Sequence, residues 1–382
     1  MAERRSRPPS TAHRSRRAGF AALGVLASLL LVTGVVRATG LPWPTASPGH
    51  SSIPATAAPA AAAPATAAPA AAAPAAAAPV AATPIASAVP TSTPTPTPEL
   101  ATTTAPVAGA SLVWSPSGAG QVAVVNMPAP WIGGSKRTAD VSIYTPPGYD
   151  PTGSQLYPAV YEAPTGLALW NGETGVISEL NSLIGSGAMP AAIVVFIDES
   201  GAPMMPTECV DSSNKQQWLE TFISKTVVDY VDLNYRTIPD PKARAIMGLS
   251  EGGFCATMLA LRHPDIFSVD IAFSGYYWAG TPSAAAALPY GGQASLIDAY
   301  SPALLAPQIA DQYRSTLYFI LASQASQDYF GPQFTNFEEI LEANGFDYLA
   351  IDSTYPHGWA QVENWTPAAL TVWGAQLEIT GV

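Results

Sequence analysis

Charged residues are scarce in this sequence of 382 residues. They make up 12% of the chain, about half of the roughly 25% that is usual for soluble domains. The scarcity is uneven, because residues 41–107 contain a single charged side chain, Glu99. We therefore expect the chain to consist of parts with different properties, only some of which fold into a globular domain.

Basic residues are particularly few in the C-terminal part. Seven of the 16 lysines and arginines lie within residues 1–40, which leaves nine basic residues against 26 acidic residues after residue 107. A surface this acidic opposes the approach of nucleic acid and of anionic lipid. No nucleic-acid partner is expected.

Motifs for metals and nucleotides are missing as well. The chain has two cysteines and four histidines. It contains no HExxH motif, no paired CxxC motifs, no P-loop and no glycine-rich dinucleotide fingerprint after the first predicted strand. The sequence therefore predicts neither a metal site nor a cofactor.

The N-terminus has the pattern of an export or anchoring signal. Residues 1–17 are basic, with six arginines, and residues 18–36 form a largely apolar run that Arg37 closes. This order places the N-terminus in the cytoplasm and the rest of the chain outside it. The run is just long enough to cross a bilayer of about 30 Å, whereas Val36-Arg37-Ala38 is tolerable as a signal-peptidase cleavage site, with a non-ideal arginine at its middle. A retained transmembrane anchor and a cleaved signal peptide both remain open.

Residues 37–108 are predicted to be a disordered linker. Proline recurs every five residues from Pro54 to Pro84, separated mostly by alanine. Proline at this spacing removes hydrogen-bond donors and clashes with the preceding helical turn, so the segment should be extended. At about 3.1 Å per residue it would reach on the order of 200 Å, enough to hold a domain within a cell envelope. The tract 91–98 (TSTPTPTP) is typical both of glycosylated stalks and of bare linkers.

Residues 109–382 are expected to form one α/β domain. Short β-type runs alternate with helical patterns, which predicts a mostly parallel sheet with helices on both faces. The first two strands have no helix between them and should form an antiparallel edge. The predicted strands are 121–126, 139–144, 158–162, 192–197, 244–248, 269–273, 316–321 and 348–351, and the predicted helices are 175–184, 216–233, 252–262, 335–343 and 370–377.

A G-x-S-x-G motif connects the strand 244–248 to the next helix. In GLSEG the central residue is Ser250, and a nucleophile elbow of this kind exposes the serine hydroxyl at the C-terminal end of a strand. The helix start would also place the Glu251 N–H where it can stabilise an oxyanion. The pattern alone is weak, and an ordinary strand-to-helix turn is the alternative.

Two histidines in the domain are candidates for the base that Ser250 needs. His263 follows the helix directly and precedes a proline, which suits a structural role at the helix end. His357 lies in a loop with glycine and proline after the last predicted strand, so we expect it to be the base. Asp328, in the loop after strand 316–321, would complete a triad in the α/β-hydrolase order. Glutamates of the following helix are the alternative to Asp328.

These motifs resemble the putative esterase family of α/β-hydrolases. The likeness is carried by YPAVYEAPTG, IVVFID, GLSEGGF followed by LRHPDIF, FSG, and a late His-Gly-Trp. The family includes esterase D, enterochelin and feruloyl esterases, and the antigen-85-type mycolyltransferases. The resemblance implies an α/β-hydrolase fold and supports the triad of Ser250, Asp328 and His357.

The resemblance also implies further site residues. In the mycolyltransferases an Asp-Gly-Leu sequence follows the third strand, and the N–H of its leucine completes the oxyanion hole. Thr165-Gly166-Leu167 matches the last two positions of this motif. Many other members have His-Gly there, so the APTG sequence is a departure from the family pattern. Aromatic residues after the third and sixth strands fall where relatives shape the substrate pocket, and they could equally be core. They are Trp170, Tyr276, Tyr277 and Trp278.

Cys209 and Cys255 are the two cysteines of the chain. An exported domain permits a disulfide, and both residues fall near the predicted elbow. A bridge between them and two buried thiols are both consistent with the sequence.

Together these features predict an extracytoplasmic serine esterase, membrane-anchored or secreted, that acts on carboxylic esters. One alternative is a cell-envelope acyltransferase, similar to the mycolyltransferases, that moves an acyl group to a sugar or glycolipid hydroxyl. The other is a non-catalytic binding protein on a hydrolase scaffold.

Overall fold

The computed structural model describes residues 111–382 except 132–137, 203–204 and 282–286. The chain divides into two units, Met1–Thr103 and Thr104–Val382, and the second contains every described residue. The basic segment 1–17, the apolar run 18–36 and the linker 37–108 lie outside the described residues. No helix of the described part has both the length and the apolar composition of a membrane span.

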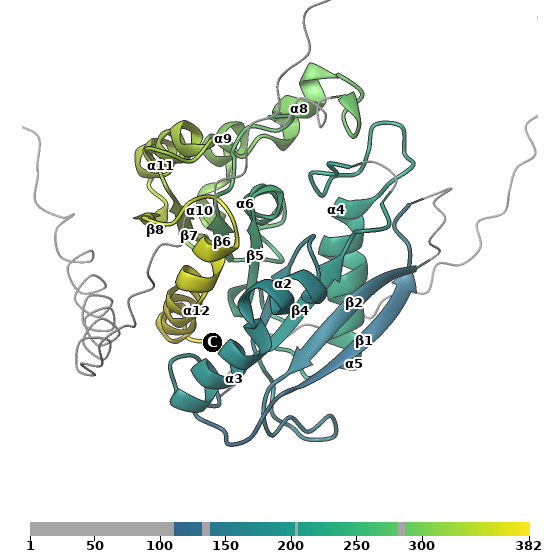
Figure 1. Ribbon diagram of the computed structural model, residues 1–382, viewed down its shortest axis with the longest axis vertical. Coiled ribbons are helices and arrows are strands. Elements are labelled where there is room, and N and C mark those ends of the chain that lie inside the picture. Colours follow the sequence, from purple (N-terminus) through teal and green to yellow (C-terminus); the bar gives the residue numbers. More distant parts are fainter. Residues whose placement is uncertain (1–110, 132–137, 203–204, 282–286) are drawn as a thin grey trace, which may run out of the picture. The chain divides into compact units, whose positions relative to one another are not determined.

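Eight strands form one mixed sheet in the order β1-β2-β4-β3-β5-β6-β7-β8 (Figure 1). β1 pairs antiparallel with β2, and β2 pairs antiparallel with β4, whereas every other neighbouring pair is parallel. The strands are β1 (Gln121–Pro128), β2 (Thr138–Thr145), β3 (Ala159–Glu162), β4 (Ile193–Asp198), β5 (Arg244–Leu249), β6 (Val269–Phe273), β7 (Tyr318–Ser323) and β8 (Asp347–Asp352). The mostly parallel sheet with an antiparallel edge confirms the predicted fold class.

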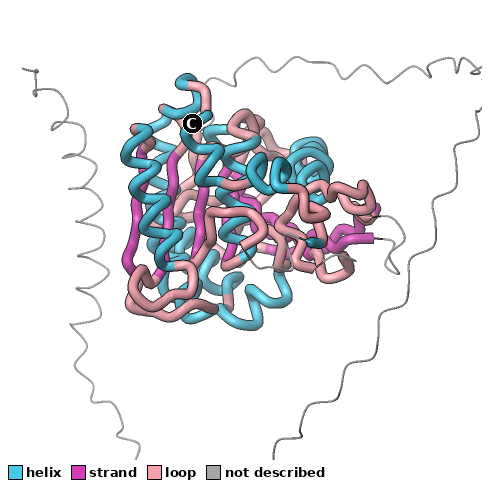
Figure 2. The backbone as a smooth tube through the Cα atoms, turned by 90° about the horizontal axis from the view of Figure 1, so that it is seen from above, coloured by secondary structure: helices cyan, strands magenta, loops and turns pink. Residues whose placement is uncertain are grey.

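Helices connect the strands and cover the sheet (Figure 2). The α-helices of the described residues are α2 (Leu167–Thr174), α3 (Val176–Ser186), α4 (Leu219–Thr221), α5 (Val228–Asn234), α6 (Glu251–Arg262), α8 (Ala294–Tyr300), α9 (Pro302–Leu305), α10 (Asp311–Arg314), α11 (Gly331–Asn344) and α12 (Trp359–Thr380). A π-helical turn, η1 (Phe222–Val227), joins α4 to α5, and two short 3₁₀ helices are η2 (Pro241–Ala243) and η3 (Ala306–Gln308).

The two faces of the sheet follow from the alternation of side chains along each strand. A Cβ added to Gly248 in β5 would lie 2.4 Å from the backbone of Gly252 in α6, so α6 covers the face to which Gly248 belongs. Phe273 of β6 pairs with Leu249, the next residue of β5, and therefore points to the other face. There it contacts Trp170 of α2, and α2 packs against α12. Helices thus lie on both faces.

Three helical segments differ from the prediction. Helix α2 was not predicted, because its sequence LALWNGET has no helical spacing of apolar residues. The predicted helix 216–233 is interrupted by the π-helical turn η1. The C-terminal helix begins at Trp359 rather than at residue 370, because the chain continues helically through Pro367, a residue that usually ends a helix.

The parallel arrangement brings several loops to one edge of the sheet. β3, β4, β5, β6, β7 and β8 run in the same direction, so the segments that follow their C-terminal ends lie at the same edge. In open α/β sheets this edge is where ligands bind. All of the predicted triad residues follow the ends of these strands.

Candidate active site

Ser250 occupies a sharp turn between β5 and α6. Its φ of 60° and ψ of −112° lie in a region that non-glycine residues rarely adopt, and such strain is concentrated at functional sites. The Ser250 N–H donates to the Phe273 carbonyl of the neighbouring strand at 2.8 Å, which holds the turn against the sheet. The side chain is left partly exposed.

The glycines of the motif allow the chain to pass close to itself. Besides the tight contact at Gly248, a Cβ on Gly252 would lie 2.7 Å from the Ala163 carbonyl oxygen. Real Cβ atoms do not approach backbone this closely, so both positions require glycine. The second contact also shows that the loop after β3 lies against the first turn of α6.

The structure brings Ser250, His357 and Asp328 together. The His357 Nε2 lies 3.0 Å from the Ser250 Oγ, and its Nδ1 lies 3.1 Å and 3.2 Å from the two carboxylate oxygens of Asp328. The histidine side chain is 33% exposed, whereas the aspartate side chain is fully buried. One ring nitrogen therefore faces the hydroxyl and the other faces a carboxylate, which is the geometry of a nucleophile, a base and an orienting acid.

Asp328 is surrounded by donors. Burial alone would raise the pKa of its carboxyl, but hydrogen bonds from His357, from the Phe330 N–H and from the Ser274 hydroxyl lower that pKa below its ordinary value. The Ser323 hydroxyl also donates to its Oδ2 at 3.2 Å. The carboxylate is thus kept ionised next to the imidazole, where it can stabilise positive charge.

Two backbone N–H groups at helix starts face the same edge of the sheet. Glu251 is the first residue of α6 and Leu167 the first residue of α2. Neither N–H has an acceptor among the described residues. Unpaired N–H groups at helix N-termini favour negative charge, so both groups are available to an oxyanion.

Glu162 holds the turn that precedes Leu167, a role that the sequence did not reveal. Its carboxylate oxygens accept from the N–H groups of Thr165 at 3.1 Å and Gly166 at 2.9 Å. Gly166 has a φ of 82°, and a Cβ there would lie 2.8 Å from the Asp198 Cβ. Burial raises the pKa of Glu162 to about 7. The sequence signal that could have revealed this role is a glutamate at the end of a predicted strand.

The Glu251 side chain holds a second loop against α6. Its Oε1 accepts from the N–H groups of Thr207 at 2.7 Å and Glu208 at 2.6 Å. The next residue, Cys209, forms a disulfide with Cys255 in the first turns of α6, with an S–S distance of 2.08 Å. The sequence indicated a role for the Glu251 N–H only, because nothing in it links this carboxylate to residue 207.

Glu208 is the centre of a buried polar cluster in this loop. It accepts hydrogen bonds from the hydroxyls of Tyr276 at 2.9 Å and Tyr290 at 2.6 Å, and from the Gly280 N–H at 2.9 Å. Burial raises the pKa of Glu208 to about 7. The cluster ties the loop after β4 to the segment after β6.

Most of the predicted pocket aromatics are core residues. Trp170 is completely buried and packs between Phe196 and Trp359, so the expectation that it lines a pocket is wrong. Tyr276 and Tyr277 are each 1% exposed, and their rings stack on Phe254 and Phe337. Trp278 alone of the four is exposed, at 39%.

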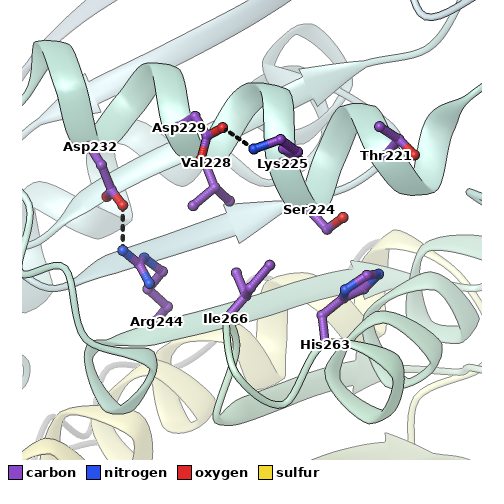
Figure 3. A pocket seen from close by; sticks show the side chains of 9 residues that line it. All are labelled: Thr221, Ser224, Lys225, Val228, Asp229, Asp232, Arg244, His263 and Ile266. Atoms are coloured by element: carbon purple, nitrogen blue, oxygen red, sulfur yellow. Dashed lines mark hydrogen bonds and ion pairs between the residues drawn. The ribbon is translucent and has the colours of Figure 1, made fainter. Parts of the chain in front are cut away.

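His263 lies far from the triad. It ends α6, and its Nε2 is 2.9 Å from a Glu220 carboxylate oxygen. It also lines a crevice of about 410 Å³ together with Arg244, the first residue of β5 (Figure 3). Since Ser250 follows the last residue of β5 and precedes the first of α6, this crevice is at the opposite end of both elements and does not belong to the site.

The described residues contain no cluster of histidine, cysteine, aspartate or glutamate that could hold a metal ion. The groups gathered at the site are a hydroxyl, an imidazole, a carboxylate and free N–H groups. Such a set can carry out nucleophilic acyl transfer through its own side chains.

Comparison with solved structures shows a shared fold. A ferulic acid esterase has a TM-score of 0.56 and 18% identity, covering 68% of this chain and 98% of that chain. An S-formylglutathione hydrolase from Agrobacterium tumefaciens has a TM-score of 0.55 and 15% identity, over 68% and 96%. The fluorophosphonate-binding serine hydrolase F of Staphylococcus aureus has a TM-score of 0.54 and 15% identity, covering 67% of this chain and 99% of that chain.

Sequence comparison identifies the family. An uncharacterized protein of Corynebacterium glutamicum is 32% identical over 83 residues, which are 22% of this chain and 19% of that protein. Residues 134–345 match the family described as Putative esterase. This region contains Ser250 and Asp328 and ends before His357, whose place in the site comes from the geometry. The match spans more than half of the chain, and the chain belongs to the putative esterase family.

Proposed function

We propose that this protein hydrolyses carboxylic esters with Ser250 as nucleophile, His357 as base and Asp328 as the acid that orients it. The observation that carries the proposal is the continuous hydrogen-bonded series from the Ser250 Oγ through both nitrogens of His357 to the buried Asp328 carboxylate. Membership of the putative esterase family supports the same reaction.

The first half of the reaction forms an acyl-enzyme. The Ser250 Oγ attacks the ester carbonyl carbon while its proton passes to the His357 Nε2. The Asp328 carboxylate holds the Nδ1–H and stabilises the imidazolium that forms. The oxyanion of the tetrahedral intermediate is stabilised by the N–H groups of Glu251 and Leu167. The intermediate then collapses as His357 returns the proton to the departing alcohol.

The second half releases the acid. Water donates a proton to His357 as it attacks the acyl carbon, and the second tetrahedral intermediate expels Ser250 with that proton. A sugar or glycolipid hydroxyl in place of water would give acyl transfer instead. The TGL match to the mycolyltransferases at Leu167 and the long predicted linker favour this second candidate.

Esters of hydroxycinnamic acids are the first substrates to test. A feruloyl esterase module of Clostridium thermocellum complexed with sinapinate shares the fold, with a TM-score of 0.50 and 17% identity over 71% of this chain and 96% of that chain. The exposed Trp278 and Tyr329 provide aromatic surface in the segments after β6 and β7.

The proposed location outside the cytoplasm is consistent with the Cys209–Cys255 disulfide, since disulfides persist in oxidising compartments.

Substitution of the triad tests the proposal. We expect Ser250→Ala and His357→Ala to lower kcat for simple aryl and feruloyl esters by at least about 10³-fold, measured by release of the alcohol or acid. Ser295→Ala, an exposed serine on α8, and His263→Ala are the matched controls and should retain the parent rate. Hydrolysis by Ser250→Ala at the parent rate would contradict the proposal. Adding a sugar acceptor and analysing the products separates hydrolysis from transfer.

A further inference from the structure

A series of buried polar groups leads to the Asp328 carboxylate. Gln361, in the first turn of α12, and Ser274, directly after β6, are both completely buried. The Gln361 Nε2 lies 2.8 Å from the Ser274 Oγ and 2.6 Å from the Ala322 carbonyl oxygen. The Ser274 hydroxyl in turn hydrogen bonds to the Asp328 carboxylate.

The chemistry of the groups determines which atom donates in each of these hydrogen bonds. The Ala322 carbonyl can only accept, so the amide atom of Gln361 that faces it must be the nitrogen. That nitrogen can only donate, so the Ser274 Oγ accepts from it. The single hydroxyl hydrogen of Ser274 is then left to point at Asp328.

Two features indicate that the arrangement is not ordinary core packing. Ser274 has a φ of 47°, a left-handed conformation that is unfavourable for a residue other than glycine. The Gln361 Oε1 is buried without a hydrogen-bond partner among the described residues, and such a group costs free energy. A strained serine and an amide with one unpaired polar atom thus meet next to Asp328.

We propose that Ser274 and Gln361 are positioning residues of the esterase: the Gln361 amide fixes the Ser274 hydroxyl as a donor to Asp328, which aligns the carboxylate with the His357 Nδ1. This inference rests on the proposed function. The Ser323 hydroxyl and the Phe330 N–H also donate to this carboxylate, so three donors besides His357 hold it. These donors hold the carboxylate in the orientation in which it accepts from the His357 Nδ1–H.

Removing the Ser274 hydroxyl should slow the chemical step without weakening substrate binding. We expect Ser274→Gly, which suits the left-handed backbone, and Ser274→Ala to lower kcat roughly tenfold with little change in KM. The acidic limb of the kcat/KM profile should move to higher pH, because a carboxylate with fewer donors binds the imidazolium more strongly. Ser224→Ala removes another buried serine hydroxyl, one that donates to the Glu220 carbonyl, and should leave kcat and the pH profile unchanged.

Gln361 should act through Ser274. We expect Gln361→Met to lower kcat to a similar extent in the parent protein and by less than twofold in the Ser274→Gly background, since the hydrogen bond that it directs is already gone. Additive losses in the double variant would contradict the proposed linkage. A folded Ser274→Gly protein with kcat within twofold of the parent and an unshifted pH profile would overturn the proposal. The failure of the proposed function itself looks different, because the parent protein would then hydrolyse no ester.

Discussion

At the scale of single residues, buried carboxyl groups dominate the surroundings of the triad. Glu162, Glu199, Glu208 and Glu251 all have a pKa raised primarily by burial. Each accepts hydrogen bonds from loops at the edge of the sheet where the site lies. They hold backbone N–H groups and hydroxyls in place, while Asp328 alone among the site's acids is held ionised against the imidazole.

The Glu208 carboxyl should make the protein less stable as pH rises. The pKa of Glu208 is about 7 in the folded protein against an ordinary value of 4.5, so the folded state retains a proton that the unfolded chain releases between these two pH values. The free energy of unfolding should therefore fall through this window, by up to about 3 kcal/mol from this group. Below pH 4.5 the carboxyl is protonated in both states and contributes no penalty.

Glu208→Gln tests this prediction because it cannot ionise. Relative to the parent, its free energy of unfolding in urea should improve steadily from pH 4.5 to pH 8. Glu378→Gln, an exposed glutamate at the end of α12, should show no such trend. A difference between Glu208→Gln and the parent that stays constant with pH would contradict the account.

At the scale of elements, the site depends on how loops are fastened to the N-terminus of α6. The loop after β4 is held by the Glu251 carboxylate at residues 207 and 208 and by the disulfide at residue 209. The loop after β3 is held by Glu162 and by its close contact with Gly252. These fastenings keep the two proposed oxyanion donors at fixed helix starts.

The disulfide should matter more for stability than for turnover. It joins residues 46 positions apart, and closing a loop of that length stabilises a protein by about 4 kcal/mol in the chain-entropy model. Cys209→Ala/Cys255→Ala should lose roughly this free energy of unfolding and retain most of kcat, because Glu251 still holds the loop. Reductant should destabilise the parent protein and leave the double variant unchanged. A parent protein whose unfolding is insensitive to full reduction would contradict this expectation.

The elements that the sequence predicted are those with a local pattern. The strands 269–273 and 244–248 are mostly apolar, apart from Asp270 and Arg244, and the predicted bounds agree with the structure to within a residue. The elbow is defined by its glycines. Helix α2 has no apolar periodicity and α12 contains Pro367, so local rules missed one and shortened the other. The Glu208 and Glu251 contacts join segments that are distant in sequence, and only the folded chain shows them.

At the scale of the whole molecule, the chain combines the described α/β domain with a predicted N-terminal anchor and linker. The fold is that of residues 111–382 and the family match covers residues 134–345, whereas the anchor 18–36 and the linker 37–108 are predictions from composition. Water and a sugar hydroxyl are the two acyl acceptors proposed for this site. Both reactions share the same first step, in which an activated Ser250 attacks an electrophile.

Active-site labelling of the full-length protein tests that step most directly. After exposure to a fluorophosphonate, mass spectrometry of the intact protein and of its peptides should show one adduct, located on Ser250. The adduct should disappear in His357→Ala and persist in His263→Ala. A folded protein that forms no adduct, or forms one at another serine, would contradict the assignment and favour a non-catalytic binding protein on a hydrolase scaffold.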